Sequence, residues 1–193
     1  MEHGLARALV TDRPSIADDE TDRRDLGMLA GGDPSALERI FDRHHQPIYR
    51  FASRMLGDAE EAADATQDAF LRLAGSPKRA DRIRSLRAWL MRVVQNGCRD
   101  RFRKRRRLPW PLDESRDEPA KPAGAGIDAL AVRDALRSLP VDQAAAVVLR
   151  FYFDYSYRDI AEVQGIAEGS ARARACRGLK RLRDLLAETE GAI

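Results

Sequence analysis

The chain has 193 residues, 44% of them apolar and 34% charged, and its formal net charge is +3. This length suffices for one or two small domains with modest cores, and no stretch approaches the ~20 apolar residues of a membrane-spanning helix. The first residues also lack the basic-then-apolar pattern of a secretory signal. These features argue against membrane insertion and lead us to expect a cytoplasmic protein.

The two cysteines, Cys98 and Cys176, are too few for a disulfide framework and do not show metal-ligand spacing. They lie in segments that we assign below to different domains. We therefore expect reduced thiols, no metal site and no cofactor. Whether either thiol has a redox role stays open.

The first part of the chain divides into an arm and a helical segment. Residues 1–25 are polar and acidic without sustained apolar periodicity, which predicts a mobile N-terminal arm. Apolar residues at spacings of three and four then predict a helix over 33–56, capped by Asp33 or Ser35. Pro47 lies inside this apolar stripe and predicts a kink or a break there.

Two further helices are expected on either side of a loop. The first covers 58–74, and glycine, serine and proline then interrupt the pattern over 75–85, which indicates a loop. The second covers 86–107 and has apolar residues along one side. Its opposite side carries a polar stripe at spacings of four, three and four, formed by Arg92, Asn96, Arg99 and Arg103. We assign 26–107 to a first domain.

A proline-rich acidic segment over 108–126 has no periodicity and predicts a flexible linker. The second domain, over 127–188, is expected to contain four helices, and Asp142 is expected to cap the second of them. Ser156 and Asp159 have the spacing of a capping box, and Gly165 can take the left-handed turn that ends a helix. Because no segment alternates with period two, we predict an all-α fold of two small helical domains joined by this linker.

The second domain has the pattern of a helix-turn-helix over 156–182. In such motifs the second helix lies in the major groove of DNA. On a helical wheel, Ala171, Ala175 and Leu182 share the packed side. The opposite side carries Arg172, Ala173, Cys176, Arg177 and Lys180, with Arg174 and Arg181 on its flank.

Positive charge is concentrated in two segments, 99–107 and 168–183, and acidic residues of the linker lie between them. This segregation indicates a polyanionic partner that is contacted at two places. Two solvated helix faces remain the alternative explanation.

Several motifs occur in an order that resembles a bacterial RNA polymerase sigma factor of the extracytoplasmic-function (ECF) type. The segment "DATQDAFLRL" is similar to the family's acidic-glutamine motif, and "RAWLMRVVQNGCRDRFRKRRR" is similar to its tryptophan-leucine helix with a basic end. The segment from 136 to 186 resembles sigma domain 4. The resemblance covers about 26–187, and it implies sigma domain 2, a linker and sigma domain 4.

The resemblance implies a promoter-reading transcription initiation factor and not an enzyme, with no catalytic residues. Domain 2 is expected to bind the β′ clamp helices of core RNA polymerase through Asp64, Gln67 and Asp68. The loop 75–85 and the polar stripe are expected to melt and recognise the −10 element. In that stripe Asn96 is the candidate base contact, whereas Arg92, Arg99 and Arg103 suit phosphates.

Domain 4 is expected to read the −35 element as duplex DNA and to touch the β flap. The base-facing positions are Arg172, Ala173, Cys176 and Arg177, since arginine can donate two hydrogen bonds to guanine. Arg174 and Arg181 suit the DNA backbone, and the amides of Gly169 and Ser170 suit a phosphate. An anti-sigma factor is a further expected partner.

The chain departs from the family pattern in three places. Alanines 171 and 175 stand where the family has branched apolar residues, Ala74 stands where an aromatic is common, and the loop 75–85 contains no aromatic residue for stacking on an unpaired base. These departures put the −10 preference and the melting efficiency in doubt.

Two other classes of protein share single features with this sequence. A dimeric helix-turn-helix regulator would need no polymerase motif, so Asp64, Gln67 and Asp68 discriminate it from a sigma factor. An enzyme is disfavoured, because no phosphate loop, nucleophile elbow or zinc motif occurs. The adjacent His44 and His45 cannot both face one metal, and we expect them at the surface or at the boundary of the core.

Overall fold

The computed structural model describes residues 18–107 and 129–190, and within these ranges the chain forms helices and connecting turns only. This confirms the predicted all-α class. The elements are α2 (Asp18–Ala30), α3 (Ser35–Leu56), α4 (Ala59–Ala74), the 3-10 helix η1 (Pro77–Arg82), α5 (Leu86–Arg107), α6 (Ala129–Ser138), α7 (Val141–Phe151), α8 (Tyr157–Gln164) and α9 (Glu168–Glu190). The predicted linker over 108–126 lies outside the described residues.

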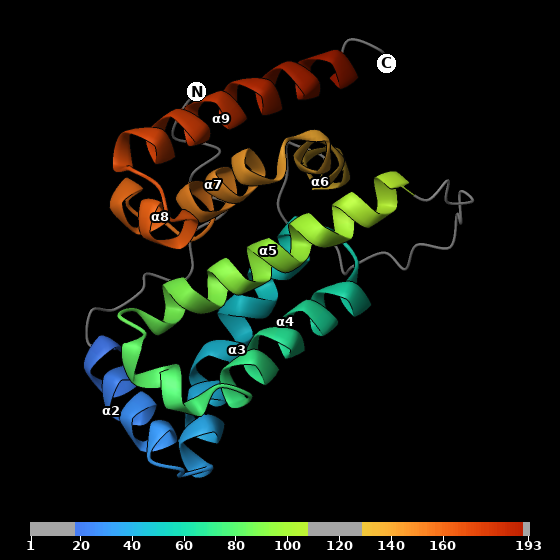
Figure 1. Ribbon diagram of the computed structural model, residues 1–193. Coiled ribbons are helices and arrows are strands. Elements are labelled where there is room, and N and C mark those ends of the chain that lie inside the picture. The colour runs from blue at the N-terminus through green and yellow to red at the C-terminus, as the bar shows by residue number, and fades with distance from the viewer. Residues whose placement is uncertain (1–17, 108–128, 191–193) are drawn as a thin grey trace.

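The helices form two groups that meet along α5 and α3. Helices α2 to α5 and η1 make up the first group, in which α3 packs on α4 and both contact α5. Helices α6 to α9 make up the second group, in which α9 lies across α7 and α8. Figure 1 shows α5 between the two groups, with α3 and α4 on one side and α7 and α8 on the other.

Helix α3 is continuous through Pro47, so the predicted break does not occur. Pro47 is itself buried, as are Ile48 and Phe51 that follow it. Burial of this face compensates for the backbone hydrogen bond that proline cannot donate. The helix ends at Gly57, whose φ of 65° is left-handed, and α4 then begins with Asp58 accepting the Glu61 amide at 2.8 Å.

The predicted arm over 1–25 is too long, because α2 begins at Asp18. Asp22 and Asp25 are buried, and their carboxylates pair with α3. Arg43 binds both of them, at 3.1 and 2.6 Å, and Arg39 binds Asp25 at 2.8 Å. Burial raises the pKa of Asp25, but the hydrogen bonds from Arg43 and Arg39 hold it below its ordinary value. The sequence showed these acids without their partners, which become adjacent only on folding.

The expectation that His44 lies near the surface is also wrong. Its side chain is fully buried, and Nε2 lies 2.8 Å from the Asp22 carboxylate. His45 is half-buried and contacts the ring of Phe41. The two adjacent histidines therefore point to different surroundings, as a helix requires of neighbours along the chain.

Residues 129–190 form four helices, as predicted for the second domain, but one predicted cap is wrong. Ser156 and Asp159 form the predicted capping box, and Gly165 has a left-handed φ of 66°. Asp142 does not cap α7, because that helix already begins at Val141 after Pro140. Its carboxylate is turned toward α5 instead.

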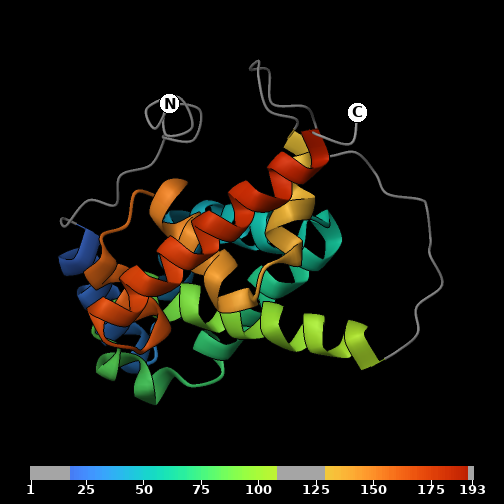
Figure 2. The ribbon, with the colours of Figure 1, turned by 90° about the horizontal axis from the view of Figure 1, so that it is seen from above.

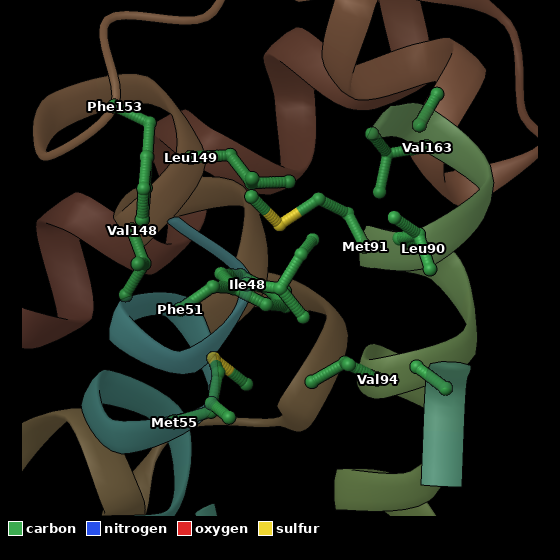
Figure 3. Packing of buried hydrophobic residues seen from close by; sticks show 14 of the residues in the cluster. Ile48, Phe51, Met55, Leu90, Met91, Val94, Val148, Leu149, Phe153 and Val163 are labelled. Carbon is green, nitrogen blue, oxygen red and sulfur yellow. The ribbon is translucent and has the colours of Figure 1, made fainter. Parts of the chain in front are cut away.

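One apolar core is shared by both groups. Met91 of α5 points toward Leu149 of α7 and Ile48 of α3, as Figure 3 shows. Phe51 of α3 meets Phe153 edge to face, with ring centroids 6.2 Å apart. Burying a side chain of this size stabilises a fold by about 1.5–3 kcal/mol, so the shared core is a substantial contact between the groups.

Helix α9 crosses α7 at Gly178, where the two backbones approach closely. A Cβ atom placed on Gly178 would lie 2.8 Å from Val147 Cγ2 and 2.9 Å from the Gln143 carbonyl. Neither neighbour can move far, since one belongs to a buried side chain and the other to the backbone of α7. Only glycine fits at this crossing.

We predict that Gly178→Ala lowers the free energy of unfolding by about 1–3 kcal/mol, the usual effect of overpacking. Urea denaturation followed by circular dichroism measures the change. Gly169→Ala is the control, because no atom lies within 4 Å of its added Cβ and α9 should tolerate it. Equal stability of the two variants would show that the α7–α9 crossing is looser than described.

Candidate nucleic-acid and polymerase interfaces

Helices α8 and α9 form a helix-turn-helix. The capping box at Ser156 fixes the start of α8, and Gly165 ends it. The amide of Ile166 donates to the Ala161 carbonyl at 3.0 Å, which closes the turn before α9 begins. The predicted packed side of α9 is buried at Ala171 and Ala175, where α9 contacts α7 and α8. Its opposite side is therefore turned outward.

The outward side of α9 carries most of the residues predicted to contact the −35 element. Arg172, Cys176, Arg177 and Arg181 are exposed, Ala173 is half-buried, and Lys180 is exposed beside them. The guanidinium of Arg172 lies over the ring of Tyr157, 5.1 Å from its centroid. Figure 2 shows α9 along the outer surface of its group.

Two groups predicted to contact DNA from this helix already have partners within the chain. The Ser170 amide donates to the Ala167 carbonyl at 2.9 Å, so it is already used within the first turn. Gly169 and the Ser170 side chain are exposed at that end of the helix. Arg174 lies on the side of α8, where it donates to Gln164 at 3.0 Å and lies 3.5 Å from the Asp142 carboxylate.

The polar stripe of α5 faces the second group of helices. Arg92 donates through Nε to the Val163 carbonyl at 2.8 Å, and its NH2 nitrogen donates to the Glu162 carbonyl. Arg99 donates to the Asn96 side chain at 2.9 Å and also binds Asp142. Asn96 is exposed, and the Arg103 side chain is 60% exposed farther along the helix. In this arrangement, Arg92 and Arg99 are held by α7 and α8.

Three side chains from α5 and α9 converge on Asp142. Its carboxylate accepts from Arg99 and, at 3.1 Å, from the Gln95 amide, and Arg174 approaches it from α9. Burial raises the pKa of Asp142, but the hydrogen bond and positive charge of Arg99, followed by the charge of Arg174, hold the pKa below its ordinary value. The carboxylate is thus ionised near neutral pH.

The predicted polymerase-binding residues lie together on α4. Asp64, Gln67 and Asp68 are exposed along one side of this helix, and Asp68 lies 3.3 Å from Arg101 of α5. Leu71 continues the same side at helical spacing, and its apolar side chain is 58% exposed. The side of α4 therefore combines acidic, amide and apolar groups.

Sequence reasoning missed the residues that join the two groups of helices. Asp142 was expected to be a helix cap, and Arg137 was not singled out, although it donates to the Leu56 carbonyl at 2.9 Å. The sequence carries no signal for these contacts, because Arg137 binds a backbone carbonyl and Asp142 binds side chains of α5 that are far from it in the chain.

Among residues 18–107 and 129–190, no group of three or more histidine, cysteine, aspartate or glutamate side chains is placed to hold a metal ion. In the same part of the chain no helix is both long and apolar enough to cross a membrane.

Fold and surface together define a two-part, all-helical protein with a helix-turn-helix in its second part. Two family models match it, sigma-70 region 2 over residues 40–108 and sigma-70 region 4 over residues 129–182. The ECF RNA polymerase sigma factor SigM of Mycobacterium tuberculosis (strain ATCC 25618 / H37Rv) is 39% identical over 173 residues, 86% of each chain. The RNA polymerase sigma factor CarQ of Myxococcus xanthus is 34% identical over 165 residues, 82% of this chain and 94% of CarQ.

Two solved structures share the fold. CnrH, in complex with the cytosolic domain of CnrY, has a TM-score of 0.64 and 25% identity, and the match covers 86% of this chain and 97% of CnrH. The sigma factor RpoE, in complex with the anti-sigma factor NepR from Bartonella quintana, has a TM-score of 0.63 and 24% identity over 78% of this chain and 96% of RpoE.

The chain belongs to the sigma-70 family of RNA polymerase sigma factors, in its ECF group. It contains region 2 and region 4 domains and directs promoter-specific initiation by RNA polymerase. It is not an enzyme, and the alternative of a dimeric regulator that acts without polymerase is set aside. Helix α2 precedes the region 2 match, which begins at Ile40 within α3. Below, domain 2 denotes α2 to α5 and domain 4 denotes α6 to α9.

The two thiols differ in burial. Burial raises the pKa of Cys98 to about 12, whereas Cys176 is exposed on the outward side of α9. The thiolate is the reactive form, so we predict that iodoacetamide at pH 8 modifies Cys176 and leaves Cys98 intact until urea unfolds the protein. Peptide mass spectrometry locates the adducts. Labelling of Cys98 at a comparable rate in the folded protein would contradict the described burial.

Proposed function

We propose that this sigma factor reads the −35 element with the outward side of α9 and the −10 element with the polar stripe of α5 and the segment 75–85. The observation that carries the proposal is that α9 has one buried side and one exposed cationic side. Its inner side is buried at Ala171, Ala175 and Gly178, and its outer side presents exposed cationic residues. A helix of this construction can enter the major groove without losing its packing.

Within α9 the proposed roles follow from position on the helix. Arg172 and Arg177 face outward and can each donate two hydrogen bonds to a guanine. Ala173 and Cys176 lie between them and suit apolar or weak polar contacts with base edges. Arg181 lies one turn beyond Arg177, where it suits a phosphate. Arg174 becomes available for the backbone only if it leaves Gln164 and Asp142.

In domain 2, Asn96 is proposed to contact an unpaired base of the −10 element. Its side chain is exposed and accepts a hydrogen bond from Arg99, which orients the amide. Arg92, Arg99 and Arg103 are proposed to bind phosphates on either side of it. Because 75–85 contains no aromatic residue, we expect hydrogen bonding rather than stacking to dominate recognition there.

The side of α4 that carries Asp64, Gln67 and Asp68 is proposed to bind the β′ clamp helices of core polymerase, with Leu71 as its apolar contact. Charged and amide groups give such an interface its register, and an exposed leucine supplies buried area. Domain 4 is proposed to contact the β flap.

We further propose that the protein acts in the cytoplasm and is restrained by an anti-sigma factor. The support is the similarity to RpoE, which was solved with the anti-sigma factor NepR, and to CnrH, which was solved with the cytosolic domain of CnrY.

Transcription reconstituted with purified core polymerase tests the polymerase surface. Templates are selected from a randomised promoter pool by the wild-type holoenzyme. We expect Asp64→Ala combined with Gln67→Ala to weaken core binding by roughly tenfold or more, because interface energy is concentrated in a few side chains. Fluorescence anisotropy measures core binding, and run-off yield measures initiation.

Glu38→Gln, an exposed change on α3, is the control for this experiment. Unchanged core affinity in the α4 double variant would remove this side of α4 from the polymerase interface. A wild-type protein that binds DNA but never confers specific initiation on core polymerase would overturn the sigma assignment itself.

Two arginines of α9 are predicted to differ in what they contribute to DNA binding. Arg177→Ala should relax sequence preference and cost about 1–3 kcal/mol on the best promoter, because a base contact is lost. Arg181→Ala should weaken binding nearly uniformly across sequences and reduce the salt slope by about one, because a phosphate contact is lost. Titrations with selected and scrambled −35 duplexes at several salt concentrations measure both effects. Identical behaviour of the two variants would mean that the outward side of α9 acts only as a cationic surface.

A further inference from the structure

The ring of Tyr157, the first residue of α8, is in contact with two arginines from other helices of domain 4. The guanidinium of Arg172 from α9 lies over this ring, 5.1 Å from its centroid, and the guanidinium of Arg150 from α7 lies 5.3 Å from the same centroid. The face of an aromatic ring carries negative charge density, so it attracts a cation at these separations. Tyr157 therefore links the helix that supports the motif to the helix proposed to enter the major groove.

The position of this ring is fixed by its own helix and by the core. Ser156 precedes it as the N-cap of α8, and the capping box with Asp159 sets the direction in which the helix starts. The ring is half-buried and packs against the apolar core. Arg150 also donates to the Tyr155 carbonyl at 3.1 Å, in the turn between α7 and α8. The ring is thus a rigid support, whereas the arginine of α9 that lies on it has a long and flexible side chain.

The contact restrains Arg172 without using its hydrogen-bond donors. Arg172 is exposed, and an unrestrained arginine at the surface samples many rotamers, whose loss opposes binding. A ring face attracts the guanidinium as a whole, so the N–H groups stay available to an acceptor such as guanine. Arg174 shows the opposite arrangement, because it donates to Gln164 and lies 3.5 Å from the Asp142 carboxylate. The ring therefore orients Arg172 and leaves it able to read a base.

We propose that Tyr157 is a positioning residue for −35 recognition, whose ring holds the Arg172 guanidinium in the orientation that reads a guanine. The proposal rests on the proposed function in one respect, the assignment of Arg172 to a base. Holding the side chain before DNA binds lowers the entropy lost on binding and favours the direction in which two hydrogen bonds reach one base. The effect is confined to the base pair that Arg172 meets, since Arg177 lies more than one turn farther along α9.

Binding of the reconstituted holoenzyme to a promoter selected from the randomised pool, and to its single-base-pair variants in the −35 element, tests the proposal. The pair read by Arg172 is the one at which Arg172→Ala abolishes discrimination. At this pair Tyr157→Leu should reduce discrimination roughly two- to fivefold, as expected for the loss of an exposed cation–ring contact. Tyr157→Phe keeps the ring and should retain the wild-type discrimination. In the Arg172→Ala background, Tyr157→Leu should have no further effect at this pair.

The pair read by Arg177 is the internal control, and Tyr157→Leu should leave discrimination there unchanged. An equal loss at every pair would mean that the substitution disturbs α8 as a whole, and it would overturn the positioning role. A Tyr157→Phe variant that behaves like Tyr157→Leu would also overturn it, because the ring would then not be the group that acts. Tyr49→Leu, which removes a half-buried tyrosine of α3, is the matched control and should keep the wild-type discrimination.

Nuclear magnetic resonance relaxation of the arginine Nε–H groups in the free protein separates this proposal from the proposed function. Tyr157→Leu should increase the mobility of the Arg172 side chain and leave that of Arg177 unchanged. If Arg172→Ala loses its base preference but the mobility of Arg172 does not respond to Tyr157→Leu, the positioning role is overturned and the proposed function stands. If the mobility responds but base preferences survive Arg172→Ala, the proposed reading role of Arg172 is wrong, and the positioning role is overturned with it.

Discussion

The packing of α5 against both domains is the contact on which the rest of the structure depends. One side of this helix completes the core of domain 2, and Met91 reaches the core of domain 4 beside Leu149. The polar stripe lies next to this apolar contact, so Arg92 and Arg99 are carried onto domain 4 with it. Apolar burial brings the domains together, and the arginines fix how they are oriented, because hydrogen bonds depend on direction and burial does not.

Close packing of apolar surfaces also positions the helix-turn-helix. Small residues at 171, 175 and 178 let α9 lie close to α7, and this close approach leaves the long cationic side chains on the outside. The light packing that appears as a departure from the family pattern is therefore matched by a close crossing. The reading helix is supported from beneath by α7 and by the capped turn after α8.

Much of this architecture could be predicted from the sequence. The helices of domain 4, the capping box at Ser156 and the turn at Gly165 were predicted, because each depends on residues close together in the chain. The α2 helix was not predicted, because Asp22 and Asp25 look like solvated acids until Arg39 and Arg43 are brought to them. His44 was misplaced for the same reason, since its burial depends on the Asp22 carboxylate.

The candidate surfaces, too, could be predicted from the sequence only in part. The sequence by itself determined which side of α9 faces outward and placed Asp64, Gln67 and Asp68 on one helix, because helical periodicity sorts residues by angle alone. It could not determine that Arg92, Arg99 and Arg174 are engaged within the chain. Their partners lie on other helices at sequence separations that no local pattern records. Only the tertiary structure decided which of the predicted DNA contacts are exposed and which are held by the other domain.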